Sequence, residues 1–353
     1  MQLESIEFSF LSIFTLITFF IFLSMSKYSY KIKNGALLDK DFSKPQAFHR
    51  NAISRSGGIA GIISLNIFFL IYFLLYSKFL YEYIFICNLM FLIGFLDDIK
   101  IKVSPSKRLL LMIIFLFFSI HFMSIEISNV DIPVLLKFLQ NNLFSSFFVL
   151  LCFLFIINGA NLIDGFNGLL TINLVTINLI LLYINISNGN NEFSIFLIAQ
   201  LIILLSFLLF NFPIAKIFLG DSGAYLMGSL IALNSIITNN LNPNYSSFFF
   251  CILLFYLFFE VFFSFLRKAV QKKSPVRPDN RHLHMLTYKK ISVIIGKNKG
   301  NYINSIIINF VYLLLVLPAL VFGKNPVISK YWFFSLIIVY LLIYLRLYRL
   351  TKN

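Results

Sequence analysis

Two adjacent aspartates, Asp97 and Asp98, close an apolar run of the sequence. Neighbouring carboxylates repel one another, and at the edge of an apolar region they are costly unless a cation or a proton donor lies close by. Hard divalent cations prefer carboxylate oxygens as ligands. The pair therefore indicates a site for a divalent metal or a phosphate, with a plain helix end that faces water as the alternative.

A second polar segment runs from Asn158 to Gly168 and follows another apolar run. Asn158, Asn161 and Asp164 recur every three residues, so on a helix-like path they would share one side. The glycines of the segment would let the backbone approach a ligand closely. A simple turn needs fewer residues of these types, and the segment therefore indicates a polar ligand site.

Asp221 and Ser222 stand just before a further apolar run. Both residues are ordinary helix caps, and capping alone would account for them. Asp221 is also placed to bind a metal at a helix N-terminus beside bound phosphates.

The stretch between Arg267 and His284 is dense in Arg and Lys, and it holds two of the four histidines, His282 and His284. A His-x-His pair can bind a transition metal, but no Cys or third His stands nearby in the sequence. Arg and Lys side chains suit phosphates, and a purely electrostatic patch beside a membrane is the alternative. Glu260 precedes the stretch inside an apolar run, where it is either functional or a structural partner for a neighbouring helix.

The rest of the chain is too apolar for a soluble protein. Of 353 residues, 59% are hydrophobic and only 12% are charged, whereas a soluble domain carries about 25% charged residues. A bilayer can receive such a surface, because lipid replaces the polar shell. We expect one membrane-embedded domain over residues 1–353, because no linker or repeat divides the sequence.

Apolar runs of about 20 residues are long enough to cross a bilayer. They predict an all-α, polytopic integral membrane protein with about eleven transmembrane helices. The predicted spans lie near residues 8–26, 58–77, 79–96, 109–125, 143–158, 169–186, 193–211, 223–238, 247–266, 303–322 and 331–346.

The basic residues predict the orientation of these spans. If the N-terminus lies outside, 25 of the 29 Lys and Arg residues fall on one side of the membrane and four on the other. Cytoplasmic loops carry such an excess of positive charge, and the excess explains the net charge of +15 without nucleic acid. Some of these charges should also meet anionic lipid headgroups. The aspartates at positions 97, 98, 164 and 221 all lie on the same, cytoplasmic side.

In this order the segments resemble the polyprenyl-phosphate N-acetylhexosamine-1-phosphate transferases, glycosyltransferase family 4. Each segment alone is a weak indication, but six in series on one side of the membrane are specific, and together they cover most of the chain. Eleven spans resemble the undecaprenyl-phosphate GlcNAc-1-phosphate transferases more than the ten-span peptidoglycan enzyme. The six segments are Arg55-Ser56-Gly57-Gly58, Asp97-Asp98, Ser104-Pro105-Ser106-Lys107, the Asn/Asp/Gly segment 158–168, Gly220-Asp221-Ser222-Gly223, and Arg277-Pro278-Asp279 with His282-Leu283-His284.

The resemblance implies a sugar-1-phosphate transferase. Undecaprenyl (polyprenyl) phosphate would attack the β-phosphate of a UDP-N-acetylhexosamine, giving polyprenyl-diphospho-sugar and UMP. The resemblance also implies Mg²⁺ as the cofactor, with Mn²⁺ as the alternative, and a homodimer in the bacterial cytoplasmic (inner) membrane. Its active site would face the cytoplasm and serve the first membrane step of O-antigen, lipopolysaccharide or another cell-envelope glycan.

The resemblance assigns roles to individual residues. Asp221 would bind the metal, and Asp97 would act as the base or positioning group for the lipid phosphate, with support from Asp98. Asp164 is expected with these catalytic residues, holding nucleotide or metal. The expected substrate-binding residues are Lys107, Asn158, Asn161, Asn167, Arg277, Arg281, His282 and His284.

Three positions depart from the family pattern. Asn167 stands where Asp is frequent, Met285 replaces the third member of a frequent His-x-His-His run, and Glu260 stands where Asp is usual. These changes leave an inactive scaffold of the same fold as one alternative. A transporter or flippase for a lipid-linked or anionic solute is the other, although transporter sites lie near the bilayer midplane and the polar residues here gather at one face.

Overall fold

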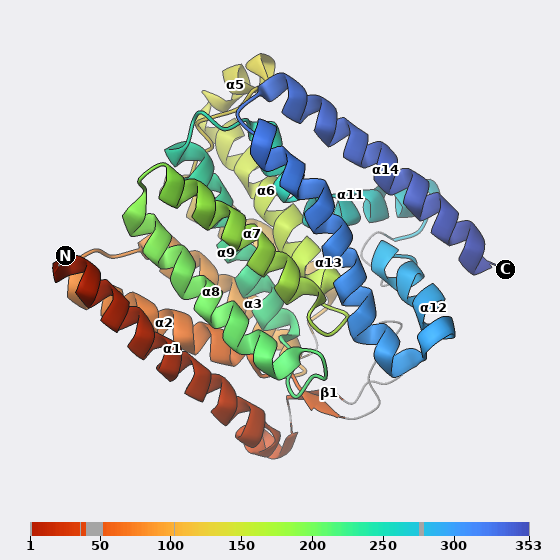
Figure 1. Ribbon diagram of the computed structural model, residues 1–353, viewed down its shortest axis with the longest axis horizontal. Helices are drawn as coiled ribbons and strands as arrows, with labels where there is room; N and C mark the ends of the chain where they lie inside the picture. The colour runs from red at the N-terminus through yellow and green to blue at the C-terminus, as the bar shows by residue number, and fades with distance from the viewer. Residues whose placement is uncertain (1, 36, 40–51, 102, 275–278, 353) are drawn as a thin grey trace.

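Long apolar helices make up most of this protein, and Figure 1 shows how they are arranged in the computed structural model. The structure describes residues 2–35, 37–39, 52–101, 103–274 and 279–352. A short 3₁₀ helix, Ser29–Gly35, and two paired antiparallel strands, β1 (Leu38–Asp39) and β2 (Ile53–Ser54), join the first two helices. The helices are α1 (Gln2–Tyr28), α2 (Gly57–Tyr76), α3 (Tyr81–Asp98), α4 (Pro105–Phe122), α5 (Pro133–Leu139), α6 (Asn142–Ile163), α7 (Leu169–Ser187), α8 (Asn191–Asn211), α9 (Gly220–Leu241), α10 (Ser247–Leu253), α11 (Phe255–Val270), α12 (Leu283–Ile295), α13 (Lys297–Phe322) and α14 (Pro326–Lys352).

The helical, polytopic membrane architecture predicted from the sequence is confirmed. Every predicted span coincides with a helix or, for residues 247–266, with the pair α10 and α11. By length and composition, eight helices of the described chain can cross a membrane, or nine if the bent pair α10–α11 is one span. Helices α3 and α9 account for the difference from eleven. Helix α3 carries three acidic residues, and α9 is rich in Asn, Ser and Thr.

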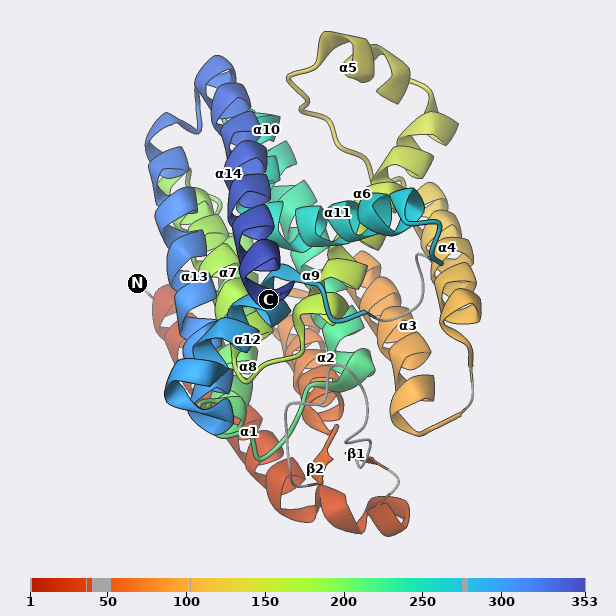
Figure 2. The same cartoon turned by 90° about the vertical axis from the view of Figure 1, so that its right-hand side faces the viewer.

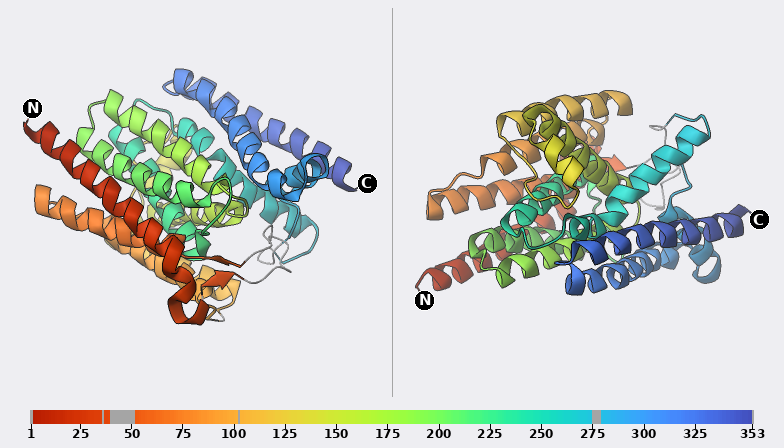
Figure 3. Two further views of the ribbon diagram at one scale, coloured as in Figure 1. Left: turned by 60° about the horizontal axis from the view of Figure 1, so that its bottom comes forward. Right: turned by 90° about the horizontal axis from the view of Figure 1, so that it is seen from above.

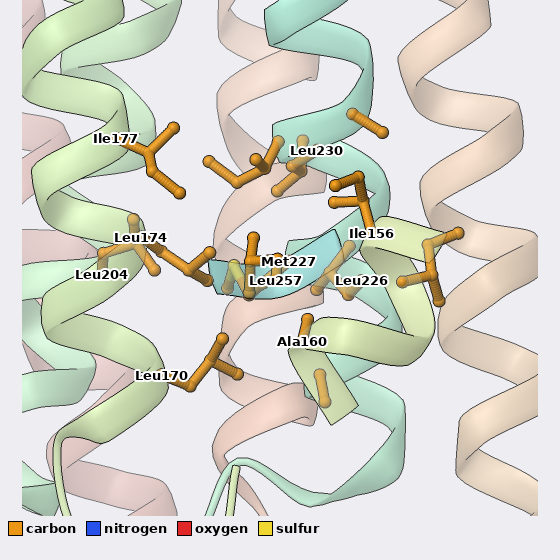
Figure 4. Packing of buried hydrophobic residues seen from close by; sticks show 14 of the residues in the cluster. Ile156, Ala160, Leu170, Leu174, Ile177, Leu204, Leu226, Met227, Leu230 and Leu257 are labelled. Carbon is orange, nitrogen blue, oxygen red and sulfur yellow. The ribbon is translucent and has the colours of Figure 1, made fainter. Parts of the chain in front are cut away.

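Helix α9 is polar for a membrane helix because other helices, rather than lipid, surround it. Almost all of its side chains are buried. In Figure 4, Leu226, Met227 and Leu230 of α9 lie among apolar side chains of the neighbouring helices, such as Ala160 of α6 and Leu174 of α7. This packing makes α9 the centre of the bundle, and its first turn is therefore fixed relative to the ends of α3 and α6.

Several polar side chains inside the bundle are satisfied by one another, and those around Asn234 form one network. The Asn234 amide of α9 donates to Gln200 at 2.6 Å and to Asn178 at 3.1 Å, and its oxygen accepts from the Tyr83 hydroxyl at 2.8 Å. A polar group in a hydrocarbon environment is costly unless it is bonded. These bonds therefore tie α3, α7, α8 and α9 together and explain why α9 tolerates its polar composition.

The second half of the bundle has a different geometry. Helices α10 and α11 meet at a bend of 77°, and Figure 2 shows α11 running across the direction of the other long helices. Helix α11 crosses α6 so closely that a Cβ on Gly159 would overlap the backbone of Leu257. Helices α13 and α14 run side by side at the edge of the bundle, with α12 beside them (Figure 3).

Candidate active site

Backbone pairing brings the start of α2 to the start of α9. The N–H groups of Gly57 and Gly58 donate to the carbonyls of Phe218 and Leu219 at 2.9 and 2.8 Å. A Cβ on Gly57 would lie 2.8 Å from the Phe218 carbonyl oxygen, so a side chain does not fit there. The pairing explains the two adjacent glycines of the sequence and sets Arg55, just before them, beside the first turn of α9.

The Asp98 carboxylate joins the end of α3 to the start of α9. It is fully buried, and its two oxygens accept from the backbone N–H groups of Asp221 at 3.0 Å and Ser222 at 2.9 Å. The first N–H groups of a helix have no partner within the helix and attract negative charge. Asp98 therefore caps α9 from another helix, and it supports the neighbouring Asp221 through the backbone.

Gly220 makes room for this contact. Its φ is +77°, a conformation that side chains rarely adopt, and an added Cβ would lie 2.6 Å from one Asp98 oxygen. A glycine is therefore required at this position for two reasons, the backbone conformation and the approach of the carboxylate.

Two arginines neutralise the acids that remain partly exposed. Arg108 of α4 forms an ion pair with Asp221, and the same guanidinium nitrogen lies 3.4 Å from Asp97. Arg55 lies 3.7 Å from Asp97, while it also forms an ion pair of 2.7 Å with Asp39. The carboxylates of Asp97 and Asp221 are 29% and 22% exposed, so a ligand from the aqueous side can reach both.

The end of α6 contributes Asn161 and Asp164 to the same cluster. The Asn161 amide donates to Asp221 at 3.1 Å. Burial, followed by the nearby charges of Asp221 and Asp98, raises the pKa of Asp164 to about 7. Among the described residues no side chain or backbone group donates a hydrogen bond to the Asp164 carboxylate. The Asp164 carboxylate would therefore favour the binding of a cation in the cluster, and a bound cation would lower the pKa of Asp164.

The loop after Asp164 is held by amides of other helices. The N–H of Gly168 donates to Asn211 at 2.7 Å, and the N–H of Asn167 donates to Asn301 at 2.8 Å. The Asn167 side chain itself donates to the Pro213 carbonyl at 2.9 Å. Asn167 thus acts within the loop as a structural donor, and in the described part of the chain it forms no hydrogen bond with the acids at the end of α3 and the start of α9.

A second cluster of charges lies between α11, α12 and α14. His282 Nδ1 lies 3.1 Å from Glu260 Oε1, and His282 Nε2 lies 3.5 Å from Asp279. Arg267 donates to both oxygens of Asp279, at 3.0 and 2.7 Å. The backbone N–H of Leu283 adds a bond of 3.0 Å to Glu260. The buried Glu260 is therefore held by the Leu283 N–H and the His282 ring, while Arg267 neutralises Asp279.

His284 links this second cluster to the loop that follows α6. Its ring meets Phe166 edge to face at 5.8 Å, and its Nδ1 lies 3.3 Å from the Tyr256 hydroxyl. Burial lowers the pKa of His284 to about 3, so the ring is neutral. Its Nε2 is buried without a partner among the described residues. A neutral imidazole nitrogen in this position can bond a polar group of a ligand.

A basic cavity of about 550 Å³ adjoins this cluster at the end of α11. Its lining includes Lys268, Lys272, Lys273 and Arg281, with Asp279 as the one acid among the lining residues that the structure describes. Positive charge of this density suits phosphate oxygens.

The structure places the other expected site residues as follows. The Lys107 side chain is exposed, whereas the next residue, Arg108, enters the acid cluster. The Asn158 amide donates to the Leu154 carbonyl of its own helix at 2.7 Å. Arg281 lies at the basic cavity, and Arg277 lies outside the described residues.

Sequence reasoning missed the side chain that actually pairs with Asp221. Arg108 follows Lys107 directly, and both lie in the first turn of α4, which Ser104 caps. Only the rotation of α4 about its axis decides which of two neighbouring basic residues faces the acids. A residue count along the sequence does not carry that information, and the phosphate role expected of Lys107 stays a prediction.

The acid cluster suits the Mg²⁺ that the resemblance implies. Asp221, Asp97 and Asp164 offer carboxylate oxygens of the kind a hard cation prefers, and Asn161 can add an amide oxygen if it turns. Asp98 is not available, because the α9 backbone occupies both of its oxygens. Within the described part of the chain no three His, Cys, Asp or Glu side chains converge as a finished metal site. Ligand phosphates would therefore complete the coordination, as is usual for Mg²⁺.

Comparison with known proteins supports the same assignment. Residues 80–239 match the model of "Glycosyl transferase family 4", a range that contains the acid cluster from Asp97 to Asp221. Over 327 residues the chain is 27% identical to the undecaprenyl-phosphate alpha-N-acetylglucosaminyl 1-phosphate transferase of Thermotoga maritima, covering 92% of this chain and 91% of that protein.

Two shorter matches are to phospho-N-acetylmuramoyl-pentapeptide-transferases. The Clostridium perfringens protein is 33% identical over 153 residues, covering 41% of this chain and 48% of the relative. The Streptococcus sanguinis protein is 31% identical over 165 residues, covering 43% and 49%. The matched part thus spans about half the length of these two relatives. Residues 80–239, which carry the acids, the asparagines and the glycine turn of this site, are therefore similar to glycosyl transferase family 4.

Proposed function

We propose that this protein transfers an N-acetylhexosamine 1-phosphate from a UDP-sugar to undecaprenyl phosphate and releases UMP. The observation that carries the proposal is the meeting of Asp97, Asp221 and Asn161 from three different helices, at a point where both carboxylates remain open to ligands. A family 4 protein whose acid cluster is both intact and accessible is an enzyme rather than a scaffold.

In the proposed reaction, an oxygen of the lipid phosphate attacks the β-phosphorus of the UDP-sugar. The bond between that phosphorus and the oxygen shared with the α-phosphate breaks, and UMP leaves with the electron pair. Asp97 acts either as the base that accepts a proton from the lipid phosphate or as the group that positions this phosphate for attack. Bound Mg²⁺, held by Asp221 with Asp164, would supply charge neutralisation at the diphosphate.

Arg108 adds a mobile positive charge to this mechanism. It is bonded to Asp221 and Asp97, and a cation at Asp221 would compete with it. Arg108 would then be free to bond a phosphate oxygen, for which a guanidinium is well suited. His282, His284 and Arg281 would bind the sugar-nucleotide from the side of α12.

The membrane arrangement is part of the proposal. The helices α3 and α9 and the pair α10–α11 join the other eight as spans, which gives eleven, with the N-terminus outside and the acid cluster facing the cytoplasm. The bacterial cytoplasmic (inner) membrane is the proposed location, a homodimer the proposed assembly, and the product the start of O-antigen or another cell-envelope glycan. The charge distribution of the loops supports this orientation.

The test is a transfer assay on detergent-purified protein. Undecaprenyl phosphate and Mg²⁺ are supplied with a panel of UDP-N-acetylhexosamines, and UMP and the lipid product are both measured. We expect product with at least one donor, loss of product on adding EDTA, and recovery with Mg²⁺ or Mn²⁺. Folded protein that yields no product with any donor would contradict the proposal and favour the scaffold or transporter interpretation.

A further inference from the structure

The C-terminal helix α14 presents three tyrosines to the second cluster. Tyr340, Tyr344 and Tyr348 are spaced four residues apart, so they lie on one face of the helix. Their rings follow one another at centroid distances of 6.3 and 6.1 Å, with interplanar angles of 10° and 7°. We call these three residues the tyrosine row.

The hydroxyls of the row bond to groups that hold the segment Asp279–His284. The Tyr340 hydroxyl donates to Glu260 Oε2 at 2.6 Å, while the other oxygen of Glu260 binds His282 and the N–H of Leu283. The Tyr344 hydroxyl donates to the Arg281 carbonyl at 3.1 Å and accepts from Arg267 at 2.6 Å. Both tyrosines are buried, at 5% and 4% exposure.

The third tyrosine acts through its ring. The Arg281 guanidinium lies 5.8 Å from the centre of the Tyr348 ring, within the range of a cation–π contact. Tyr344 and Tyr348 thus contact the segment directly, through the carbonyl and the guanidinium of Arg281, whereas Tyr340 reaches it through Glu260.

The position of this segment decides where His284 lies. His282 is the residue before the first turn of α12, and His284 follows inside that turn, packed on Phe166 of the loop after α6. A shift of the segment would move the unpartnered His284 Nε2 relative to the acid cluster. Bonds to Glu260 and Arg281 from α14 oppose such a shift, because buried donors and acceptors are costly to leave without partners.

We infer that the tyrosine row is a positioning device for the sugar-nucleotide side of the site, although none of its residues reaches the acid cluster. The inference rests on the proposed function for the identity of the ligand. The contacts of the row with the segment Asp279–His284 do not depend on the identity of the ligand. The role of the row can therefore be tested separately from the proposed function.

The first measurement is hydrogen exchange of the peptide that covers residues 279–288, in detergent and without substrates. Tyr340→Phe and Tyr344→Phe remove one hydroxyl each and keep the ring, and we expect exchange to rise about fivefold, as the loss of a typical hydrogen bond implies. Tyr331→Phe is the matched control, because Tyr331 lies on the same helix and is 68% exposed. Unchanged exchange in both variants would overturn the inference.

Tyr348 provides a contrast within the row. Tyr348→Phe keeps the ring beneath Arg281 and should leave exchange unchanged, whereas Tyr348→Leu removes the ring and should raise exchange about twofold. An equal effect of Phe and Leu would contradict a contact made through the ring.

The second measurement uses transfer kinetics. In Tyr344→Phe we expect the KM for the UDP-sugar to rise about fivefold and the KM for undecaprenyl phosphate to stay within about twofold of wild type. An unchanged donor KM, or an equal rise for both substrates, would overturn the positioning role. If wild type transfers no sugar at all, the proposed function fails, while the exchange experiment still decides the role of the tyrosine row.

Discussion

The two charged clusters of this protein are built differently. At the ends of α3, α6 and α9, the carboxylates of Asp97 and Asp221 are partly exposed and are neutralised by arginine side chains. Between α11, α12 and α14, Glu260 is buried and is bonded by a histidine, a backbone N–H and a tyrosine. An arginine on an exposed acid can leave when a ligand arrives, but a backbone donor on a buried acid cannot. The first cluster is therefore suited to exchange partners, and the second to hold a segment in place.

Asp221→Asn should give the largest effect and separates the two clusters most clearly. The change removes the charge that we propose binds the metal, with little change of shape, so we expect turnover to fall about 10²–10³-fold while the protein still inserts and keeps its Tm. Transfer assays and thermal unfolding in detergent measure both quantities. The control is Glu126→Gln, because Glu126 is exposed and lies on the opposite side of the membrane in the predicted topology. Wild-type transfer by Asp221→Asn would contradict the metal assignment.

Arg108→Ala should lower kcat about tenfold to a hundredfold, because it removes the charge that can pass from Asp221 to a phosphate. The adjacent Lys107→Ala variant is matched in charge but alters an exposed side chain. We expect it to weaken use of the phosphate substrates by only about twofold to threefold. Steady-state kinetics with each substrate varied in turn will measure both. Equal losses in the two variants would mean that the rotation of α4 differs from the one described here.

Glu260→Gln should affect stability more than chemistry. It removes a buried charge that faces His282, and we expect the free energy of unfolding to fall by about 2–3 kcal/mol. Glu82→Gln is the control, because Glu82 is a partly exposed acid at the start of α3, and its loss should change stability little. Thermal unfolding of the two variants measures the difference. A Glu260→Gln protein as stable as wild type would show that the second cluster does not hold the fold.

Gly220→Ala tests the one rigid part of the acid cluster, the contact of Asp98 with the start of α9. Gly189→Ala is a close control, since both glycines have a φ of +77° but an added Cβ at Gly189 meets nothing within 4 Å. Each alanine should cost about 1 kcal/mol from backbone strain. Only Gly220→Ala should also weaken Mg²⁺ binding, by about tenfold, because it displaces Asp98. Calorimetric titration with Mg²⁺ measures this, and equal affinities in the two variants would count against the role of Asp98.

The pH dependence of stability should show the smallest effect. The pKa of Asp164 is about 7 in the folded protein and 3.8 in its ordinary state. Between these values the folded protein binds more protons than the unfolded chain, so stability falls as pH rises. In EDTA we expect Tm to drop by about 1–3 °C between pH 5 and pH 7.5. Asp164→Asn should reduce this slope, and an identical slope in the variant would assign it to other groups.

The sequence predicts the helices well because hydropathy is a local property. All eleven predicted ranges coincide with helices, including α3 and α9, whose polar residues make them poor membrane spans by composition. The 77° bend between α10 and α11 could not be predicted, because it lies within one apolar run and depends on packing against α6.

The site could be predicted only in part. The acids at the ends of α3, α6 and α9 were expected to share one face, and Asn161 does meet Asp221. The division of labour between Asp97 and Asp98 depends on which side chain faces α9, and adjacent residues do not reveal that. The tyrosines of α14 recur every fourth residue in the sequence, but their partners lie more than 60 residues away.

Asn167 has a consequence for how this chain could change over time. Its amide donates to the Pro213 carbonyl, so an Asp at this position would face a carbonyl oxygen and have no proton to offer it at neutral pH. Because this bond is exposed, the acid would turn toward water, and the loop would lose one of the bonds that tie it to the segment after α8. The substitution to Asp would therefore be tolerated by the fold but would leave this loop less firmly held.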